Sequence, residues 1–281
     1  MKMPEMTLRL GDVFLTLRGL LPSEDDGYLC RFRTEEQRTD VLCTVTRDDT
    51  LQPPKEPPRV REVWKEVWTA EGRHVLCYYS DLRHEKCYAM LTECAEDRLS
   101  LCFNGLLAHD LGRTVLSCIA MEHLLLHRGE AIFHAAWIER NGKALLFSGA
   151  SGAGKSTHTA LWESLRHTPV CNGDKALLFL RGGTLWAGGL PYAGSSGICT
   201  DRRLPVHAVV FLSHGKENVL TRLDAAEAVK LLVSQMPVQR WNEGDVSAAL
   251  KLAVKVAETV PVYTYACLPD ASAVAYLDGL I

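Results

Sequence analysis

The octet from Gly149 to Ser156, GASGAGKS, has residue types and a spacing that suit the binding of phosphate groups. It fits the pattern G-x-x-x-x-G-K-[ST], in which glycines let the backbone curl until successive N–H groups point inward. In that pattern the lysine, here Lys155, reaches the terminal phosphates, and the hydroxyl of Ser156 is a ligand for Mg²⁺. A helix that begins directly after the loop adds the positive end of its dipole. The octet therefore predicts a nucleotide phosphate site.

The flanking sequence is typical of the strand, loop and helix that this motif needs. Residues 143–148, KALLFS, are a short apolar run after the turn signal Asn141-Gly142, which predicts a buried strand. Residues 156–165 carry apolar side chains at helical spacing. The alternative is a flexible glycine turn that binds nothing. On the first interpretation, the residues in contact with a nucleotide are Gly149, Ala150, Ser151, Gly152, Ala153, Gly154, Lys155, Ser156 and Thr157.

Asp174 is the candidate for a second metal-positioning group. Phosphoryl transfer needs a carboxylate that holds Mg²⁺, usually at the end of an apolar strand. Asp174 follows the apolar pair Val170-Cys171 and lies 19 positions after Lys155, enough for one helix and the next strand. We therefore expect Ser156 and Asp174 to hold Mg²⁺ together. The alternative is an ordinary Asn-Gly-Asp turn, which turn propensity alone would explain.

Composition excludes several classes of function. The chain has 281 residues, of which 47% are hydrophobic and 23% charged, as in ordinary soluble globular proteins. A net charge of −3 without a basic stripe gives no reason to expect nucleic acid. No apolar run is long enough for a membrane span, and the N-terminus lacks the apolar core of a signal peptide. Ten cysteines without a C-x-x-C pair then favour reduced thiols in a cytoplasmic protein.

Two domains are expected, a β-rich accessory domain over residues 1–109 and an α/β domain with a mixed sheet over residues 110–281. Alternating apolar residues predict strands throughout residues 7–104, including 29–32. In the second domain a helix is expected over 112–127 and hairpins around 131–148 and 176–186. Strands at 206–212 and 262–266 and helices at 224–235, 245–258 and 270–280 follow. Asp224 and Glu227 have the spacing of a capping box.

Taken together, Phe133-His134, the strand pair, the octet and Asp174 resemble the catalytic domain of HPr kinase/phosphorylase, whose nucleotide-binding core is related to that of phosphoenolpyruvate carboxykinase. The resemblance covers roughly residues 112–281. The chain resembles more closely the HPr kinase-like proteins whose genes lie near peptide-modification genes, some of which phosphorylate serine on a peptide. It implies nucleotide phosphates on residues 149–156, Lys155 on the phosphoryl group, Mg²⁺ between Ser156 and Asp174, and His134 beside the pocket.

The chain departs from this pattern at two places. HPr kinases have two adjacent acids where this chain has Gly173-Asp174, and the first of them is the expected base for the serine hydroxyl. The acid of a later signature stretch has no clear match in residues 188–198. Both departures concern phosphoryl transfer, and neither changes a residue of the phosphate loop.

Three further features have both a functional and an ordinary interpretation. Residues 188–197 are rich in glycine and proline, so we expect a long irregular segment that forms the acceptor side of the pocket or a plain surface loop. Arg202 or Arg203 could stabilise charge in the transition state, or the run Asp201-Arg202-Arg203 could be a solvated turn. His123 and His127, four apart on an expected helix, could share a metal or belong to a partly buried helix face.

The first functional hypothesis is an ATP-dependent kinase that uses Mg²⁺ and phosphorylates a hydroxyl, most simply a serine of a peptide or small protein. The second is a nucleotide-binding switch or scaffold that has lost its base. A lyase of the phosphoenolpyruvate carboxykinase type is third, because its larger set of metal ligands is not visible in the sequence. The sequence leaves open the acceptor, the choice between ATP and GTP, and the oligomeric state.

Overall fold

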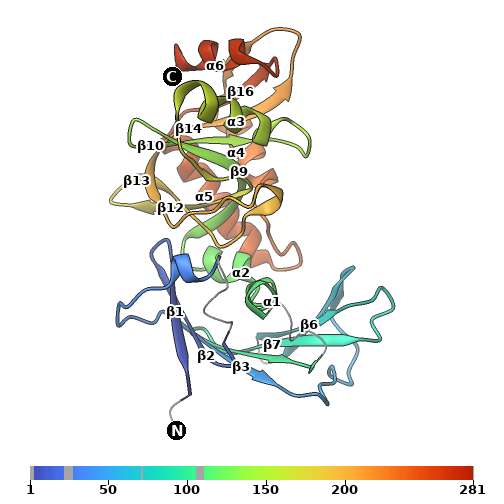
Figure 1. Cartoon of the computed structure of the whole chain (residues 1–281). Coiled ribbons are helices and arrows are strands. Elements are labelled where there is room, and N and C mark those ends of the chain that lie inside the picture. Colours follow the sequence, from blue (N-terminus) through green and yellow to red (C-terminus); the bar gives the residue numbers. More distant parts are fainter. Residues whose placement is uncertain (1–2, 22–27, 71, 106–110, 281) are drawn as a thin grey trace. The chain divides into compact units, whose positions relative to one another are not determined.

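The computed structural model describes residues 3–21, 28–70, 72–105 and 111–280 (Figure 1). The chain divides into two compact units, residues 1–124 and 125–281. The boundary expected between residues 109 and 110 lies outside the described residues, and the division by contacts falls after Leu124 instead.

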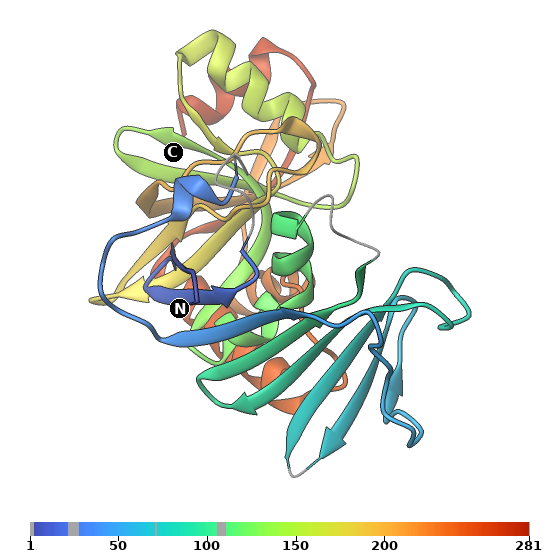
Figure 2. The ribbon, with the colours of Figure 1, turned by 60° about the horizontal axis from the view of Figure 1, so that its bottom comes forward.

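The first unit is built on a β-sheet, as its alternating pattern predicts. Its strand order is β1-β2-β3-β8-β7-β6-β5-β4, with parallel pairing of β2 with β3 and of β3 with β8, and antiparallel pairing elsewhere. Figure 2 shows the strands of this sheet side by side. The strands are β1 (Glu5–Leu10), β2 (Val13–Gly19), β3 (Val41–Arg47), β4 (Val60–Arg61), β5 (Lys65–Ala70), β6 (Arg73–Tyr79), β7 (Cys87–Ala95) and β8 (Arg98–Phe103).

Two sequence-based expectations are wrong in this part of the chain. The strand expected at residues 29–32 is a single 3₁₀ turn, η1 (Cys30–Phe32), closed by a bond from the Phe32 N–H to the Leu29 carbonyl. Leu29 and Phe32 are both buried, and their spacing of three suits such a turn. The helix expected over 112–127 is two helices, α1 (Leu111–Cys118) and α2 (Met121–Leu126), because Ala120 between them has φ = 52°.

The second unit is an α/β structure with a mixed sheet in the order β10-β9-β12-β13-β14-β16-β15, and β10 also pairs with β14. β10, β14 and β16 are parallel to one another, and the other pairs are antiparallel. The elements are β9 (Glu130–Arg140), β10 (Lys143–Ser148), α3 (Lys155–Arg166), β11 (Val170–Asn172), β12 (Lys175–Arg181), β13 (Thr184–Gly188), η3 (Gly194–Ser196), β14 (Arg203–His214), β15 (Val219–Arg222), α4 (Ala225–Ser234), α5 (Glu243–Thr259), β16 (Val262–Cys267) and α6 (Ala271–Asp278).

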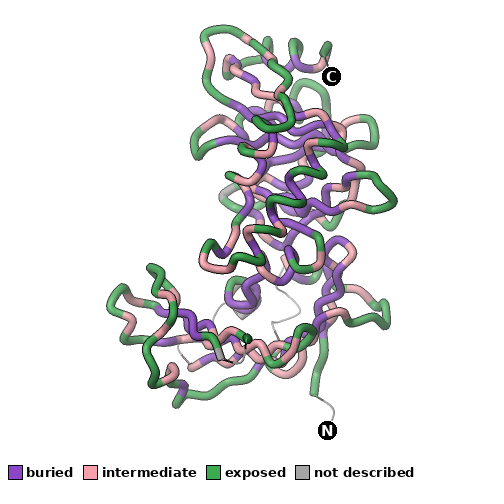
Figure 3. The backbone as a smooth tube through the Cα atoms, turned by 180° about the vertical axis from the view of Figure 1, so that it is seen from behind, coloured by how far each residue is buried: buried purple, intermediate pink, exposed green. Residues whose placement is uncertain are grey.

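Strand β10 is covered on both faces, which explains why its sequence is an uninterrupted apolar run. Ala144 and Leu146 belong to the core that includes α4 and α5. Leu145 and Phe147 belong to the core on the other face, with Trp162 of α3 and side chains of α6. Figure 3 shows how fully the strands of this unit are buried. A rigid, two-sided strand therefore leads directly into the glycine octet.

The direction of the parallel strands determines where a ligand can meet the sheet. The carboxyl ends of β10, β14 and β16 lie at one edge, and ligands of α/β sheets bind outside such edges. The octet leaves β10 at this edge. Within the described ranges, no helix combines the length and the apolar character that a membrane crossing requires.

Candidate nucleotide-binding site

The loop between β10 and α3 has a conformation that only glycine adopts freely. Gly149, Gly152 and Gly154 have φ values of 134°, 79° and 95°. A Cβ atom at Gly149 would lie 2.7 Å from the carbonyl oxygen of Leu212 in β14, so this position also has no room for a side chain. The strand, glycine loop and helix predicted from the sequence are all confirmed. Successive backbone N–H groups in such a turn form a concave site for anions.

Lys155 is the first residue of α3 and is held inside its own loop. Its Nζ donates to the carbonyl oxygens of Gly149 and Ala150, at 2.9 and 3.1 Å. The residue is only 9% exposed, and this burial lowers the pKa of the ammonium group, while the charge of Asp174 acts in the opposite direction. Gly154 precedes it as the N-cap and has no side chain to occupy the helix N-terminus. The ammonium and the helix dipole are therefore directed at the same loop.

Asp174 lies in the turn between β11 and β12, and Asn172 determines the shape of that turn. The Oδ1 atom of Asn172 accepts from the backbone N–H groups of Asp174 and Lys175, at 2.8 and 2.9 Å. Asn172 is fully buried, so its amide is a fixed part of the structure. The turn interpretation and the metal interpretation of Asp174 are thus compatible, because the turn is what presents the carboxylate.

His134 lies beside Asp174 in the structure. It faces Lys175 in the pairing of β9 with β12, and its Nε2 is 3.5 Å from the Asp174 Oδ1. Burial, followed by the positive charge of Lys155, lowers the pKa of His134, so its imidazole is neutral at pH 7. The hydroxyl of Ser148, the last residue of β10, donates to the His134 carbonyl at 2.7 Å. The structure thus brings Lys155, His134 and Asp174 to one edge of the sheet.

The segment 188–197 is irregular, as predicted, apart from the 3₁₀ turn η3, and it packs against the Asp174 turn. The amide Nδ2 of Asn172 donates to the carbonyls of Leu190 and Tyr192, at 3.3 and 2.8 Å. A Cβ atom on Gly194 would lie 2.7 Å from the Asp174 Cβ. The side chain of Ser196 occupies the space into which a side chain at Gly173 would extend. This segment therefore forms one wall beside the carboxylate.

The structure does not bring Arg202 to the loop. Its guanidinium forms an ion pair with Glu139, whose partner across the β9–β10 hairpin is Ala144. The loop begins after Ser148, four residues further along β10, which corresponds to roughly 13 Å of strand. The hypothesis that Arg202 stabilises charge at the phosphates receives no support from this position.

Sequence reasoning missed one side of the site. A cavity of about 110 Å³ adjoins the loop, lined by Gly152, Gly154 and Thr157 and by residues that follow two of the parallel strands. His214, at the end of β14, donates from Nε2 to the Gly152 carbonyl at 3.0 Å. The end of β16 contributes Cys267, Leu268 and Pro269. The signal that could have identified them is positional, because all of them lie at the carboxyl ends of strands parallel to β10.

Comparisons with known proteins add little to this geometry. No protein-family model and no curated protein matches the chain. Among solved structures, the Hpr(Ser) kinase/phosphatase from Coxiella burnetii matches with a TM-score of 0.32 and 12% sequence identity, over 53% of this chain and 87% of that one. A likeness of this size is too slight to assign a fold or a family. The function of the site therefore has to be inferred from its own residues.

The crowding at Gly149 leads to a first prediction. Gly149→Ala should destabilise the protein by about 3 kcal/mol, because it combines backbone strain with a clash against the Leu212 carbonyl. Gly152→Ala, where φ is also positive but no atom lies within 4 Å, should cost only about 1 kcal/mol. Urea unfolding of both variants measures the difference. Equal destabilisation would show that the Leu212 contact is unimportant.

A second prediction concerns His158, in the first turns of α3. Its ring is buried against Phe147, its Nε2 accepts from the Trp162 indole at 3.1 Å, and burial lowers its pKa to about 4. Between pH 6.5 and 4 the unfolded chain binds a proton there that the folded protein does not, so stability falls as the pH falls through this range. Protonation of His158 in the unfolded chain should therefore lower the free energy of unfolding by about 2 kcal/mol between pH 7.5 and pH 5.

His158→Gln keeps a hydrogen-bond acceptor for Trp162 but does not titrate, so its unfolding free energy should depend less on pH over this range. The exposed His167, at the end of α3, provides the control His167→Asn, since asparagine tolerates its left-handed conformation. Urea unfolding at pH 7.5 and 5.0 makes the comparison. If His158→Gln and the wild type lose the same stability on acidification, the buried imidazole is not the source of the acid sensitivity.

Proposed function

We propose that the chain is an ATP-dependent kinase that uses Mg²⁺ and transfers a phosphoryl group to a hydroxyl, such as a serine of a peptide or small protein. The observation that supports this most directly is the grouping of Lys155, His134 and Asp174 beside the glycine loop. A phosphate site alone would need only the loop and the lysine. The neutral imidazole next to a carboxylate adds groups that suit proton transfer and metal binding.

The residues present fit ATP and Mg²⁺. The glycine loop offers backbone N–H groups to phosphate oxygens, and Lys155 lies where its ammonium could exchange the Gly149 and Ala150 carbonyls for phosphate. Ser156 is exposed in the first turn of α3, and Asp174 is partly exposed, so both could hold Mg²⁺. When bound, the metal neutralises charge that develops on the phosphates.

His134 replaces the acid that the resembling kinases have at the position of Gly173. Its lowered pKa keeps Nε2 able to accept a proton at pH 7. In this proposal Nε2 takes the proton of the acceptor hydroxyl, and the nearby Asp174 carboxylate compensates the positive charge that then forms on the ring. The segment 188–197, which packs against Asp174, would position the acceptor.

The second candidate is a nucleotide-binding switch or scaffold that transfers no phosphoryl group. Gly173 supports it, because Ser196 fills the space beside this glycine and leaves no room there for a carboxylate. In that case the loop and Lys155 bind the nucleotide, and His134 has only a structural role.

Phosphoryl transfer from radiolabelled ATP to peptides encoded near the gene distinguishes the two candidates. The full chain, with Mg²⁺, is expected to label a serine-containing peptide, and His134→Gln is expected to bind ATP normally but to label much less. His207→Gln is the matched control: burial also lowers the pKa of His207, but this residue lies near Lys143 and Arg140, away from the loop. Binding of ATP without any transfer by the wild type would support the switch. Full transfer by His134→Gln would show that His134 is not the base.

A further inference from the structure

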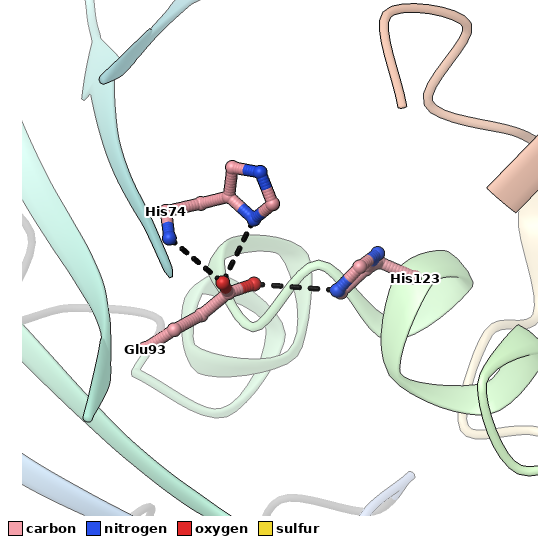
Figure 4. Close-up of side chains that lie close together, drawn as sticks. All are labelled: His74, Glu93 and His123. Carbon is pink, nitrogen blue, oxygen red and sulfur yellow. Dashed lines mark hydrogen bonds and ion pairs between the residues drawn. The ribbon is translucent and has the colours of Figure 1, made fainter. Parts of the chain in front are cut away.

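Two histidines and a glutamate meet in the first unit, far from the glycine loop in sequence. His74 lies in β6, Glu93 in β7 and His123 in α2, and we call them the His-Glu-His cluster. Figure 4 shows the Glu93 carboxylate directed between the two imidazoles. The three residues are 19 and 30 positions apart along the chain, so no sequence motif reveals them.

The distances within the cluster are those of potential metal ligands. The Glu93 Oε2 is 2.8 Å from the His74 Nδ1, and the Glu93 Oε1 is 3.3 Å from the His123 Nε2. One ligand atom from each residue can be chosen so that all three lie within 4.8 Å of one another. In a tetrahedral zinc site with bonds of about 2.0–2.1 Å, ligand atoms are about 3.3 Å apart. The cluster therefore needs only small side-chain movements to enclose an ion.

Charge and burial also suit a cation. The three side chains are 15%, 16% and 20% exposed, which leaves an opening to solvent but little competition from bulk water. The Glu93 carboxylate lies between the two imidazoles and is the acidic member of this ligand set.

The backbone holds Glu93 in this position. The backbone N–H of His74 donates to the Glu93 Oε2 at 2.8 Å, and this hydrogen bond fixes the orientation of the carboxylate. The register of β7 with β8 shifts between Glu93 and Ala95, a bulge of the kind that redirects side chains next to functional sites. Local strand geometry thus presents the carboxylate to the imidazole of α2.

We propose that the His-Glu-His cluster is a Zn²⁺ site, with the His74 Nδ1, the Glu93 carboxylate and the His123 Nε2 as protein ligands and a water as the fourth. Two imidazoles and one carboxylate form a ligand set that zinc accepts in proteins. The ion would tie strands β6 and β7 to helix α2. Neither the glycine loop nor Asp174 takes part.

A second histidine–glutamate pair in the same unit provides a matched control. The His84 Nδ1 is 3.0 Å from the Glu66 Oε1, and the His84 ring stacks on Tyr79 at 4.4 Å. There the Glu66 carboxylate also accepts from the Tyr79 hydroxyl at 2.7 Å and pairs with the guanidinium of Arg61, which cannot ligate a cation. His84→Ala therefore removes a comparable imidazole without touching the proposed site.

Zinc binding to the full-length, tag-free protein tests the proposal by competition with a chromophoric chelator. One equivalent of Zn²⁺ should bind. His74→Ala and His123→Ala should each lower the Zn²⁺ affinity by more than about 100-fold, because loss of a group that only hydrogen-bonds to a ligand already costs up to about 100-fold. Glu93→Gln, which keeps the shape of the side chain, should weaken it as well. His84→Ala and Asp174→Asn should bind as the wild type does. Circular dichroism establishes that each variant is folded.

Co²⁺ identifies the ligands by spectroscopy. The His-Glu-His cluster predicts visible bands of tetrahedral Co²⁺ without the intense near-ultraviolet charge transfer that thiolate ligands produce, and His123→Ala should remove those bands. Strong thiolate charge transfer would assign the ion to cysteines and overturn the proposal. Unchanged zinc affinity in folded His123→Ala and Glu93→Gln, or no binding of Zn²⁺ to the wild type at micromolar concentration, would also overturn it.

Discussion

Replacing Lys155 with alanine is expected to weaken ATP binding by about 10- to 150-fold. A hydrogen bond between a charged donor and phosphate contributes about 1.5–3 kcal/mol, which corresponds to that range. In the absence of ligand the ammonium is held by the carbonyls of Gly149 and Ala150, so it is already in the loop and has little distance to move. Isothermal calorimetry at fixed ionic strength, with Mg²⁺ present, measures the effect.

Lys143→Ala controls for the loss of one positive charge, because Lys143 is exposed at the opposite end of β10. It should change the ATP affinity little. Urea unfolding of Lys155→Ala separates a local loss of binding from a general loss of structure. If folded Lys155→Ala binds ATP as tightly as the wild type, the glycine loop is not the nucleotide site and the proposed function fails with it.

The second large effect is expected for Asp174→Asn. This change preserves the size of the side chain but removes the negative charge, so Mg²⁺ should no longer strengthen ATP binding, and phosphoryl transfer should fall below detection. ATP binding without metal should remain within about two-fold of the wild type, because Lys155 and the loop are unchanged. Calorimetric titrations with and without Mg²⁺ make the comparison, and Asp201→Asn, at an exposed position of the same unit, is the control.

Asp174→Asn has a second signature in the titration of His134. The charge of Asp174 raises the pKa of His134 against the lowering effects of burial and Lys155, so removing it should lower that pKa further. NMR titration of the imidazole can follow the shift. A variant that retains the full Mg²⁺ dependence, with an unchanged His134 titration, would leave Asp174 as a turn residue only.

The parts of the site that were predictable are those specified by local sequence. The apolar run 143–148, the glycine octet and the helix after it follow one another along the chain, so spacing alone predicts their order and type, and the structure confirms them. The capping box is equally local: Asp224 accepts from the Glu227 N–H at 2.8 Å. The position of Asp174, in the turn just after β11, was equally predictable, whereas its metal role stays a prediction.

The parts that were not predictable depend on contacts between distant segments. Arg202 follows segment 188–197 closely in sequence, but its ion pair with Glu139 holds it at the other end of β10. The break at Ala120 interrupts a sequence that favours helix, and no residue type there signals it. His123 was considered with His127, four residues away, and their ligand atoms do lie within 4.8 Å of each other, but the structure also places Glu93 of β7 beside the His123 imidazole. Strand pairing and bulges determine which distant side chains come into contact, and the periodicity of a single sequence does not predict these contacts.

The buried amide of Asn172 links segment 188–197 to the Asp174 turn, whereas the phosphate loop is anchored separately, at the end of β10 and against Leu212. The two walls of the site are therefore modular. Substitutions at the other positions of segment 188–197, with Asn172 and Gly194 retained, would change the surface beside Asp174 and leave the glycine loop as it is. Chimeras made in this way are a direct route to related proteins that share one nucleotide site and differ in what they recognise next to it.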